Sequence, residues 1–502
     1  MKQYKTSVTL ISPPSRSFNH YRPPIALLSL SGYLLKNKIS TKIIDIVFPS
    51  IVRDKKFWSN IESHRKWIEN QILKNYQINQ SPYVGITCYT PEYEEVLLLA
   101  NKIKLINKKV KIIIGGIHPT LYPNDFFSTP NSPVDYQVIG EGEETLLELI
   151  NALSKHKSIK NIRGICFFSK NKITINPPRP TVDNLDNLYY PAYKLINMKY
   201  YTTASPYAIR GCFLRSFYLL ATRGCPSSCT FCVAKKLRQF NGGGKCTRIR
   251  SAESLVKEIK LLKNTHHIDS FYFIDDLFTI NKDNVINFCN ILKEEKLNLI
   301  WGCSAKVSTL NETLLKSMSE AGCVQIDFGI ERGSDKALLE VQKGINLSMI
   351  NNIFKLCKKY NIRTFANFLI NLPNETKKDL LDINNLIEKL SPDIVTLNIF
   401  CPYPGTEIYD SHSYKFSKSE YKELFNSADL INTYPTKYRF SLHKIDLNQW
   451  SNTYNKKYNH FFPVLKFHLS FKYFYILFKS KNKLDYLKQF KNLVFEFILQ
   501  KF

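Results

Sequence analysis

Short apolar runs alternate with amphipathic stretches along the first 150 residues of the chain. Near-continuous runs of Val and Ile predict strands at 7–12, 42–47, 83–87, 110–116 and 135–140. Residues 25–35 and 96–106 have helical periodicity, and a further helix begins near Glu143. Strands that are apolar on both faces and separated by helices indicate a parallel sheet covered on both sides. We therefore predict a doubly wound α/β domain, Rossmann- or flavodoxin-like, over residues 1–150, with ligands at the carboxyl ends of its strands.

A second alternating series follows residues 151–205, a segment containing Pro-Pro-Arg-Pro at 177–180, which we expect to be an extended linker. Strands are predicted at 217–221, 270–274, 299–303, 324–330, 364–370 and 394–400, with helices such as 252–262, 282–292 and 349–359 between them. Six such β-then-α units predict a partial (β/α)6 barrel of the TIM kind over residues 206–410, with its chemistry at the carboxyl ends of the strands. Residues 411–502 are expected to form a small, helical C-terminal accessory domain.

Composition adds a strong positive charge but identifies no partner. The chain has 70 Lys and Arg against 42 Asp and Glu, a net charge of +28, which can favour nucleic acid, membranes or anionic substrates. The lysines are dispersed, so nucleic acid is not the expected partner. The Lys- and aromatic-rich C-terminal segment around 467–478 has two interpretations: a peripheral membrane or RNA surface, or, as we favour, a helical cap over the barrel.

The cysteine pattern bears on the cellular compartment. Twelve cysteines lack the spacing of a disulfide framework. The N-terminal residues contain no secretory segment, and no apolar run reaches the ~18 residues of a spanning helix. These features predict a soluble, cytoplasmic protein.

Three of the cysteines lie in one loop directly after the first predicted barrel strand. Cys225, Cys229 and Cys232 have the spacing C-x3-C-x2-C, and the aromatic Phe231 precedes the last of them. Three thiolates on one loop can hold three corners of a four-iron cluster, which leaves one iron open to another ligand. The alternative is structural zinc, but zinc needs four closed ligands, commonly two C-x2-C pairs, and no second pair occurs in the sequence.

This stretch resembles the signature of the radical S-adenosylmethionine (radical SAM) superfamily. The resemblance implies a 4Fe–4S cluster held by the three cysteines, with SAM bound at the open iron beside Phe231. Reduction of the cluster would cleave SAM to methionine and a 5′-deoxyadenosyl radical. The cysteines are ligands in this interpretation, and the sequence identifies no catalytic acid or base.

Later segments of the barrel resemble motifs of cobalamin-type radical SAM enzymes. Phe-Ile-Asp-Asp-Leu-Phe at 273–278 is similar to D-D-x-F and implies that Asp275 or Asp276 lies near the methionyl amine, although either could instead cap the next helix. Gly-Ile-Glu-Arg-Gly at 329–333 resembles G-x-E-S-G and implies contact of Glu331 with the SAM ribose or amine. Arg332 replaces the usual serine and would either pair with the SAM carboxylate or turn outward. Asn367 begins a segment similar to the region that frames adenine.

Three motifs of the first domain resemble cobalamin-binding domains attached to such enzymes. They are Pro-Pro-Ile-Ala-Leu-Leu at 23–28, Gly-Gly-Ile-His-Pro-Thr at 115–120 and Gly-Glu-Gly-Glu at 140–143. By this resemblance, contacts to the corrin or its tail are expected from Thr87, Thr90, Gly115, Gly116, His118, Gly140 and Gly142. The chain lacks the Asp-x-His-x-x-Gly loop that supplies a cobalt-ligating histidine, so no histidine is expected on the lower face of cobalt, and His118 has a structural role as its alternative. A flavodoxin-like domain with tight glycine turns is the simpler alternative.

Together these resemblances imply a cobalamin-dependent radical SAM enzyme that methylates an unactivated carbon, or a phosphinate phosphorus, of a small-molecule intermediate. One SAM would methylate cobalamin and a second would generate the radical, with electrons from a donor such as flavodoxin or ferredoxin. An oxidative cyclase or a rearrangement enzyme without methyl transfer remains the alternative. A tRNA-modifying enzyme is disfavoured because only Cys88 and Cys166 precede Cys212, too few for the additional N-terminal cluster of the methylthiotransferases.

Overall fold

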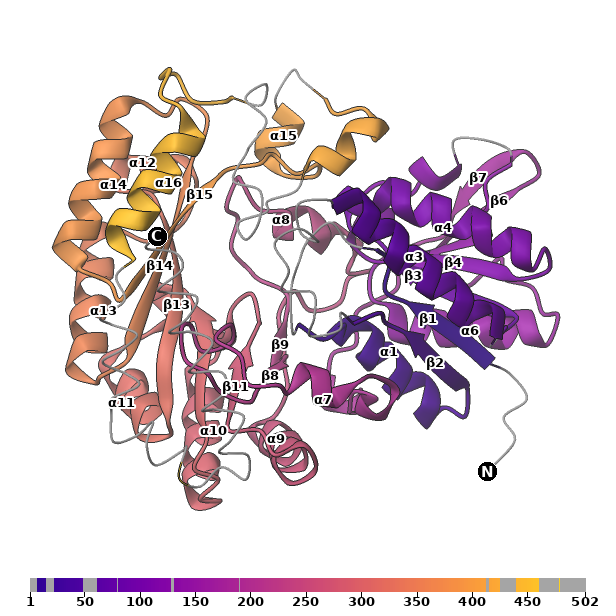
Figure 1. The fold of residues 1–502 in the computed structure, drawn as a ribbon, viewed down its shortest axis with the longest axis horizontal. Helices are drawn as coiled ribbons and strands as arrows, with labels where there is room; N and C mark the ends of the chain where they lie inside the picture. Colours follow the sequence, from indigo (N-terminus) through magenta and orange to yellow (C-terminus); the bar gives the residue numbers. More distant parts are fainter. Residues whose placement is uncertain are drawn as a thin grey trace.

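The computed structural model describes residues 7–14, 22–47, 61–78, 80–127, 131–188, 190–411, 415–424, 439–459 and 478. They form two α/β units that face each other (Figure 1). Most of the predicted C-terminal domain lies outside the described residues, and so does the Lys- and aromatic-rich segment apart from Phe478. Within the described ranges, no helix combines the length and apolarity needed to cross a membrane.

The first unit is built on a seven-stranded sheet of order β2-β1-β3-β4-β5-β6-β7. Its strands are β1 (Ser7–Ile11), β2 (Ser40–Ile44), β3 (Tyr83–Thr87), β4 (Lys111–Gly115), β5 (Tyr136–Val138), β6 (Ile165–Ser169) and β7 (Lys172–Ile175), of which the first five are parallel. Helices α1 (Ile25–Lys36) and α6 (Gly142–Ser154) pack on one face, while α3 (Ile61–Ile78) and α4 (Tyr93–Ile106) pack on the other. Apolar residues therefore fill both faces of the strands, which confirms the doubly wound prediction.

The prediction that residues 151–205 form an extended linker is wrong in part. Strands β6 and β7 within it form an antiparallel hairpin, and β6 pairs with β5 at the edge of the first sheet. The reason is local: two short apolar runs flank Lys170 and Asn171, which both have positive φ, 50° and 62°. Such two-residue turns match the twist of a hairpin.

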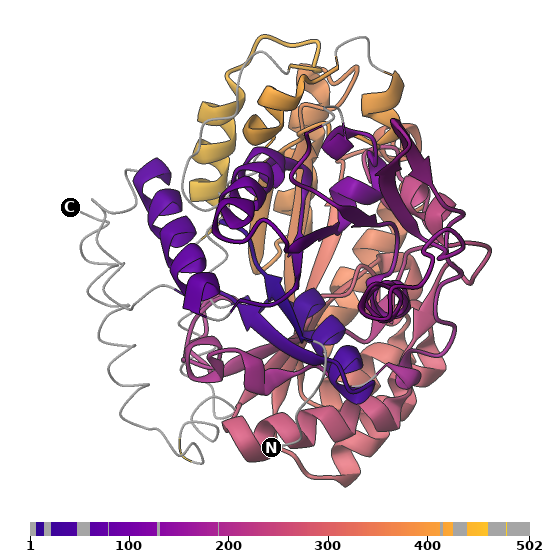
Figure 2. The ribbon, with the colours of Figure 1, turned by 90° about the vertical axis from the view of Figure 1, so that its right-hand side faces the viewer.

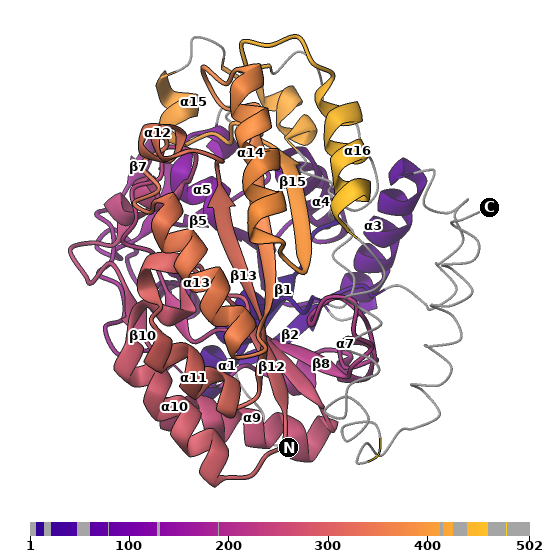
Figure 3. The same ribbon diagram turned by 90° about the vertical axis from the view of Figure 1, so that its left-hand side faces the viewer.

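The second unit is a six-stranded parallel sheet of order β15-β14-β13-β12-β11-β8, curved into a partial barrel. The strands are β8 (Ser216–Leu219), β11 (Ser270–Phe273), β12 (Ile300–Ala305), β13 (Cys323–Glu331), β14 (Arg363–Ile370) and β15 (Ile394–Ile399). Helices α9 (Ala252–His266), α10 (Lys282–Glu294), α11 (Glu312–Glu320), α13 (Leu347–Lys359) and α14 (Lys377–Leu390) cover its outside (Figure 3). The partial (β/α)6 prediction is thereby confirmed.

Shorter elements complete the two units. In the first unit, α5 (Ile117–Leu121) lies between β4 and β5. The others are α7 (Met198–Tyr201), the ribbon β9 (Thr222–Arg223) with β10 (Arg248–Ile249), α8 (Ala234–Leu237), α12 (Asp335–Glu340) and α15 (Glu407–Ser411). Seen from the side of the first unit, that unit lies over the barrel strands (Figure 2).

One helix after residue 411, α16 (Leu447–Tyr458), protects the edge strand β15. The side-chain oxygens of Asn455 and Asn459 accept hydrogen bonds from the backbone N–H groups of Leu397 and Val395, at 2.9 and 3.0 Å. An uncovered edge strand would present these groups for pairing with another chain. In the described part of the C-terminal region, α16 thus packs on the barrel, whereas Phe416, Tyr421 and Leu424 pack in the core of the first unit.

Candidate cofactor site

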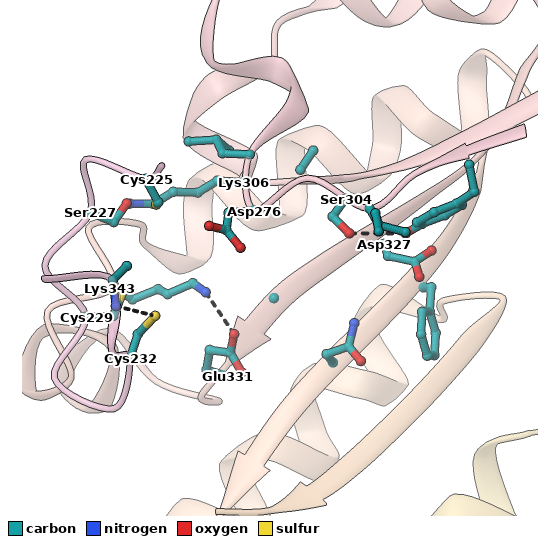
Figure 4. A pocket seen from close by; sticks show the side chains of 18 of the residues that line it. Cys225, Ser227, Cys229, Cys232, Asp276, Ser304, Lys306, Asp327, Glu331 and Lys343 are labelled. Carbon is teal, nitrogen blue, oxygen red and sulfur yellow. Dashed lines mark hydrogen bonds and ion pairs between the residues drawn. The ribbon is translucent and has the colours of Figure 1, made fainter. Parts of the chain in front are cut away.

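The cysteine loop follows β8 and β9 and lines a cavity of about 450 Å³ at the carboxyl ends of the barrel strands (Figure 4). Cys225, Cys229, Cys232 and Phe231 all line this cavity. The loop is fixed from outside, because Arg238 donates hydrogen bonds to the carbonyls of Cys225 and Ser227 at 2.9 and 2.7 Å. In the described part of the chain, no three His, Cys, Asp or Glu side chains converge closely enough to hold a single metal ion. Three thiols around one cavity suit a four-iron cluster that leaves one iron open.

The two aspartates after β11 have different environments. Asp275 is buried and its Oδ1 accepts hydrogen bonds from the backbone N–H groups of Ala221, at 2.8 Å, and Thr222. Burial raises the pKa of Asp275 to about 7, although these hydrogen bonds oppose the shift. Asp276 instead points into the cavity and forms no hydrogen bond or ion pair with any described residue, while burial raises its pKa (Figure 4). Asp275 thus holds the strand that leads to the cysteine loop, and Asp276 is available to a ligand.

Glu331 is at the end of β13 and is paired with a lysine that the sequence did not reveal. Lys343 Nζ lies 2.8 Å from Glu331 Oε1 and 5.6 Å from the centroid of the Phe231 ring. Burial lowers the pKa of Lys343, but the Glu331 charge outweighs it and the net shift is upward. A second lysine, Lys306, donates to Ser227 Oγ at 3.2 Å. Burial raises the pKa of the Cys229 thiol, and both lysines oppose that shift.

Arg332 does not lie in the cavity, which corrects the expectation that it meets SAM. Its Nη1 pairs with Glu375 and donates to the Leu369 carbonyl at 3.2 Å, and its Nη2 lies 3.5 Å from Asp379. Glu331 is the last residue of β13 and has a positive φ of 71°, so the chain changes direction there and Arg332 follows outside the strand. Glu375 in turn contacts His443 Nε2 at 3.0 Å, which ties the segment before α16 to the barrel. Asn367 does line the cavity, and its Nδ2 donates to the Phe328 carbonyl at 3.3 Å.

A second cavity, of about 280 Å³, lies between the first sheet and α1. Its lining includes Thr87, Gly115, Gly116, Gly140 and Gly142. Gly116 has a φ of 112°, and a Cβ there would come within 2.8 Å of the Cys88 carbonyl oxygen. Strand ends without side chains leave a cradle that a large planar ligand can approach closely.

Thr90 and His118 are not part of the lining of this cavity. Both are buried, and His118 Nδ1 lies 3.3 Å from Thr90 Oγ1 while Nε2 lies 3.5 Å from Asp125. Burial lowers the pKa of His118 to about 3, so the ring is neutral at ordinary pH. Of the two roles expected for His118, a contact to the corrin or a structural role, its buried position fits the structural one.

A third cavity, of about 510 Å³, is a neighbour of the other two. It shares Arg22 and Ile274 with the cysteine cavity, and Leu27, Thr87 and Leu220 with the glycine cavity. The cavity of the cysteine loop and the cavity of the glycine turns therefore each share wall residues with one intervening cavity.

Two arginines of the β9–β10 ribbon join the units through the Gly-Glu-Gly-Glu motif. Arg223 reaches Glu143 with Nη2 at 2.6 Å and Nη1 at 3.2 Å, and Arg248 Nη1 lies 2.7 Å from Glu141. Ser29 of α1 also donates to Glu143, at 2.8 Å. We call these four charged residues the interdomain clamp.

Comparison with known proteins agrees with this architecture. The Radical SAM superfamily model matches residues 219–387, and the B12 binding domain model matches residues 16–150. A protein of Pyrococcus horikoshii, named as an uncharacterized methyltransferase, is 32% identical over 410 residues, which are 80% of this chain and 82% of that protein. The chain belongs to the B12-binding radical SAM family. Its cofactors are accordingly a 4Fe–4S cluster, SAM and cobalamin.

Two further proteins show how far the likeness of this radical SAM enzyme extends. The anaerobic magnesium-protoporphyrin IX monomethyl ester cyclase of Rubrivivax gelatinosus is 26% identical, over 74% of this chain and 67% of the cyclase. The structure of the radical SAM methyltransferase TsrM from Kitasatospora setae superposes with a TM-score of 0.61 at 17% identity, covering 80% of this chain and 76% of that one. The latter likeness concerns the fold alone.

Proposed function

We propose that this enzyme transfers a methyl group from SAM to an unactivated carbon, or a phosphinate phosphorus, of a small molecule. The observation that carries the proposal is that the cavities of the cysteine loop and of the glycine turns each share wall residues with one intervening cavity. A substrate between them would be within reach of both cofactors. The relative from Pyrococcus horikoshii, named as a methyltransferase, supports this choice.

Each lining residue has a proposed role that follows from its position. Cys225, Cys229 and Cys232 hold the cluster. The carboxylate of Asp276, which has no described partner, and that of Glu331 accept charge-assisted hydrogen bonds from the SAM amine or ribose. The ammonium groups of Lys306 and Lys343 offset the negative charge of the thiolates and of the SAM carboxylate, and they complete a set that spacing alone did not reveal.

The remaining predicted contacts divide between the two units. Phe231 and Asn367 border the space for SAM in the barrel. In the first unit, the glycine turns and Thr87 provide close backbone approach for the corrin or its tail.

When bound, the three cofactors supply reductive cleavage of SAM and transfer of its methyl group. For one substrate C–H bond, two SAM molecules and two electrons give the methylated substrate, S-adenosylhomocysteine, methionine and 5′-deoxyadenosine, and the substrate hydrogen ends in 5′-deoxyadenosine. The electrons require a low-potential donor such as flavodoxin or ferredoxin. The protein's part is to hold both sites at fixed positions and to keep water from the path between them.

The second candidate function is oxidative cyclisation or rearrangement without methyl transfer. The 26% identity to the magnesium-protoporphyrin cyclase favours retaining it. The cysteine and glycine sites serve both reactions equally, so product analysis must separate them.

The test is made on anaerobically purified protein with a reconstituted cluster and added hydroxocobalamin. We expect about four irons per chain, retained corrin, and 5′-deoxyadenosine after reduction with SAM. Methyl-deuterated SAM and an extract of candidate substrates should yield deuterated product together with S-adenosylhomocysteine. A Cys229→Ala variant should lose the cluster and 5′-deoxyadenosine but keep corrin. Cleavage of SAM without bound corrin, or turnover of substrate without label, would refute methyl transfer.

A further inference from the structure

The cysteine cavity has a second end among the barrel strands that the proposed cofactor contacts leave unused. Figure 4 shows Asp327 and Ser304 on the side of the cavity away from the cysteines. Asp327 precedes Glu331 by four residues on β13, so it lies deeper in the barrel. The walls at this end carry three aromatic rings, those of Tyr218, Tyr272 and Phe365.

Arg210 supplies a cation at this end with hydrogen-bond donors to spare. Its guanidinium lies 4.7 Å from the centroid of the Phe365 ring, and Nε lies 4.0 Å from Asp327 Oδ2, beyond hydrogen-bonding distance. Its side chain makes no hydrogen bond with any residue in the described ranges. The side chain is 37% exposed, facing the cavity that it lines.

The backbone of Arg210 is fixed on both sides. Its N–H donates to Gln325 Oε1 at 2.9 Å, and Arg363 Nη2 donates to its carbonyl at 2.8 Å. Neighbouring residues of the same segment, Ala208 and Ile209, are buried against the lower part of the barrel. The base of the side chain is therefore fixed before any ligand arrives, and the Phe365 ring lies beside the guanidinium, which lowers the entropic cost of binding.

A second arginine reinforces the positive charge. Arg22 lines both this cavity and the interdomain cavity, and its guanidinium lies 5.8 Å from the centroid of the Tyr218 ring. The carboxylate of Asp327 already accepts a hydrogen bond from Gln325 Nε2 at 2.7 Å. This end of the cavity thus has two positive charges, on Arg22 and Arg210, and one negative charge, on Asp327, which already accepts a hydrogen bond.

We propose that the substrate carries an oxyanion, a carboxylate or a phosphoryl group, which binds Arg210 with support from Arg22, and a flat unsaturated body that packs on Tyr218, Tyr272 and Phe365. A guanidinium fork matches the geometry of carboxylate and phosphoryl oxygens, which an ammonium does not. The aromatic walls favour a flat ring system over a bulky saturated one. This assignment rests on the proposed function, because it takes this end of the cavity to be the substrate site.

The test compares three probes that share one flat body: 2-naphthoate, 2-naphthyl phosphate and the neutral 2-naphthamide. Binding to the holoenzyme, loaded with cluster, cobalamin and S-adenosylhomocysteine, is measured by calorimetry. We expect at least one anionic probe to bind about tenfold or more tightly than the amide, as for a charge-assisted hydrogen bond. Arg210→Gln should remove that preference, and Arg210→Lys should restore only part of it. Arg163→Gln, at an arginine that lines none of the three cavities, is the matched control and should keep the preference.

The outcomes separate this inference from the proposed function. Equal binding of the amide and both anions, no binding of any probe at millimolar concentration, or an unchanged preference in Arg210→Gln overturns the inference. The anion that binds more tightly identifies the carboxylate or the phosphoryl class. Cluster and cobalamin absorbance verify that each variant is loaded. Wild-type protein that loads both cofactors and forms 5′-deoxyadenosine, yet shows no anion preference, refutes the substrate class without affecting the cofactor chemistry.

Discussion

Replacing Glu143 by Gln removes the more buried of the two carboxylates in the interdomain clamp. The side chain of Glu143 is 5% exposed, and its carboxylate binds both terminal nitrogens of Arg223 and the Ser29 hydroxyl. Breaking a buried ion pair by neutralising one partner costs roughly 3–5 kcal/mol, because the other charge stays buried. Arg223 keeps a 3.5 Å contact to Glu141, which places the expected loss at the low end, about 3 kcal/mol.

The pKa of Glu143 gives an independent figure. Burial would raise the pKa, but Arg223 outweighs it and lowers the pKa to about 2 from the ordinary value of 4.5. That shift corresponds to about 3 kcal/mol of stability at neutral pH. Because the folded-state pKa is lowered, this stability is present above pH 4.5 and is lost as the pH falls towards 2.

Urea unfolding of the anaerobic apo-protein measures the effect. Glu148→Gln is the matched control on the same helix, since Glu148 pairs with Arg179 but its side chain is 49% exposed. An exposed pair contributes about 0–1 kcal/mol. The deficit of Glu143→Gln relative to the wild type should also shrink from pH 7 to pH 3. A loss at pH 7 no larger than that of Glu148→Gln, or one independent of pH, would refute the reasoning.

Three further outcomes follow from the described contacts. Burial raises the folded-state pKa of Asp275 to about 7, so its ionisation destabilises the fold as the pH rises. The Tm of Asp275→Asn minus the Tm of the wild type should therefore increase from pH 4 to pH 7. A difference that stays constant over this range would contradict the prediction. Arg332→Gln should lower the free energy of unfolding in urea by roughly 3–5 kcal/mol but leave the affinity for S-adenosylhomocysteine unchanged. Lys343→Gln should weaken that affinity. Weaker binding in Arg332→Gln would show that Arg332 contacts the cofactor after all. Asn455→Ala should cost roughly 1–3 kcal/mol because the Leu397 N–H loses its partner. A loss no larger than that of Asn352→Ala, at an exposed position of α13, would show that water replaces it.

The strands of both sheets could be predicted from the sequence because parallel strands are apolar on both faces. Each of the six barrel strands was expected within about two residues of its observed ends. The β6–β7 hairpin was not predicted because the prolines on its C-terminal side indicate a linker. The sequence does contain a pattern typical of a hairpin, two short apolar runs on either side of Lys170 and Asn171. Edge hairpins of this kind bury less surface and leave a weaker hydrophobic pattern.

The site was predictable only where chemistry depends on local spacing. Cys225, Cys229 and Cys232 lie on one loop, so their grouping at one cavity follows from local spacing. The sequence could not distinguish Asp275 from Asp276, because which of two adjacent carboxylates is buried depends on the β8–β9 backbone that one of them meets. Lys343 lies 111 residues after Cys232 and reaches the loop only through the return of the chain after α12. No spacing rule connects two such positions.

The glycines and the glutamates of the Gly-Glu-Gly-Glu motif at 140–143 have different roles, and the sequence predicts only that of the glycines. Glycines at a strand end were expected to admit a ligand, and Gly140 and Gly142 do line the cavity of the first unit. The carboxylates between and after them serve another purpose, because Glu141 and Glu143 hold Arg248 and Arg223. Arg223 is two residues before Cys225, so the same four-residue turn that borders one cofactor cavity also anchors the loop of the other. A short ribbon and a buried ion pair therefore help to fix the separation of the two sites, together with contacts from segment 151–205 such as that of Tyr201 with Asp45.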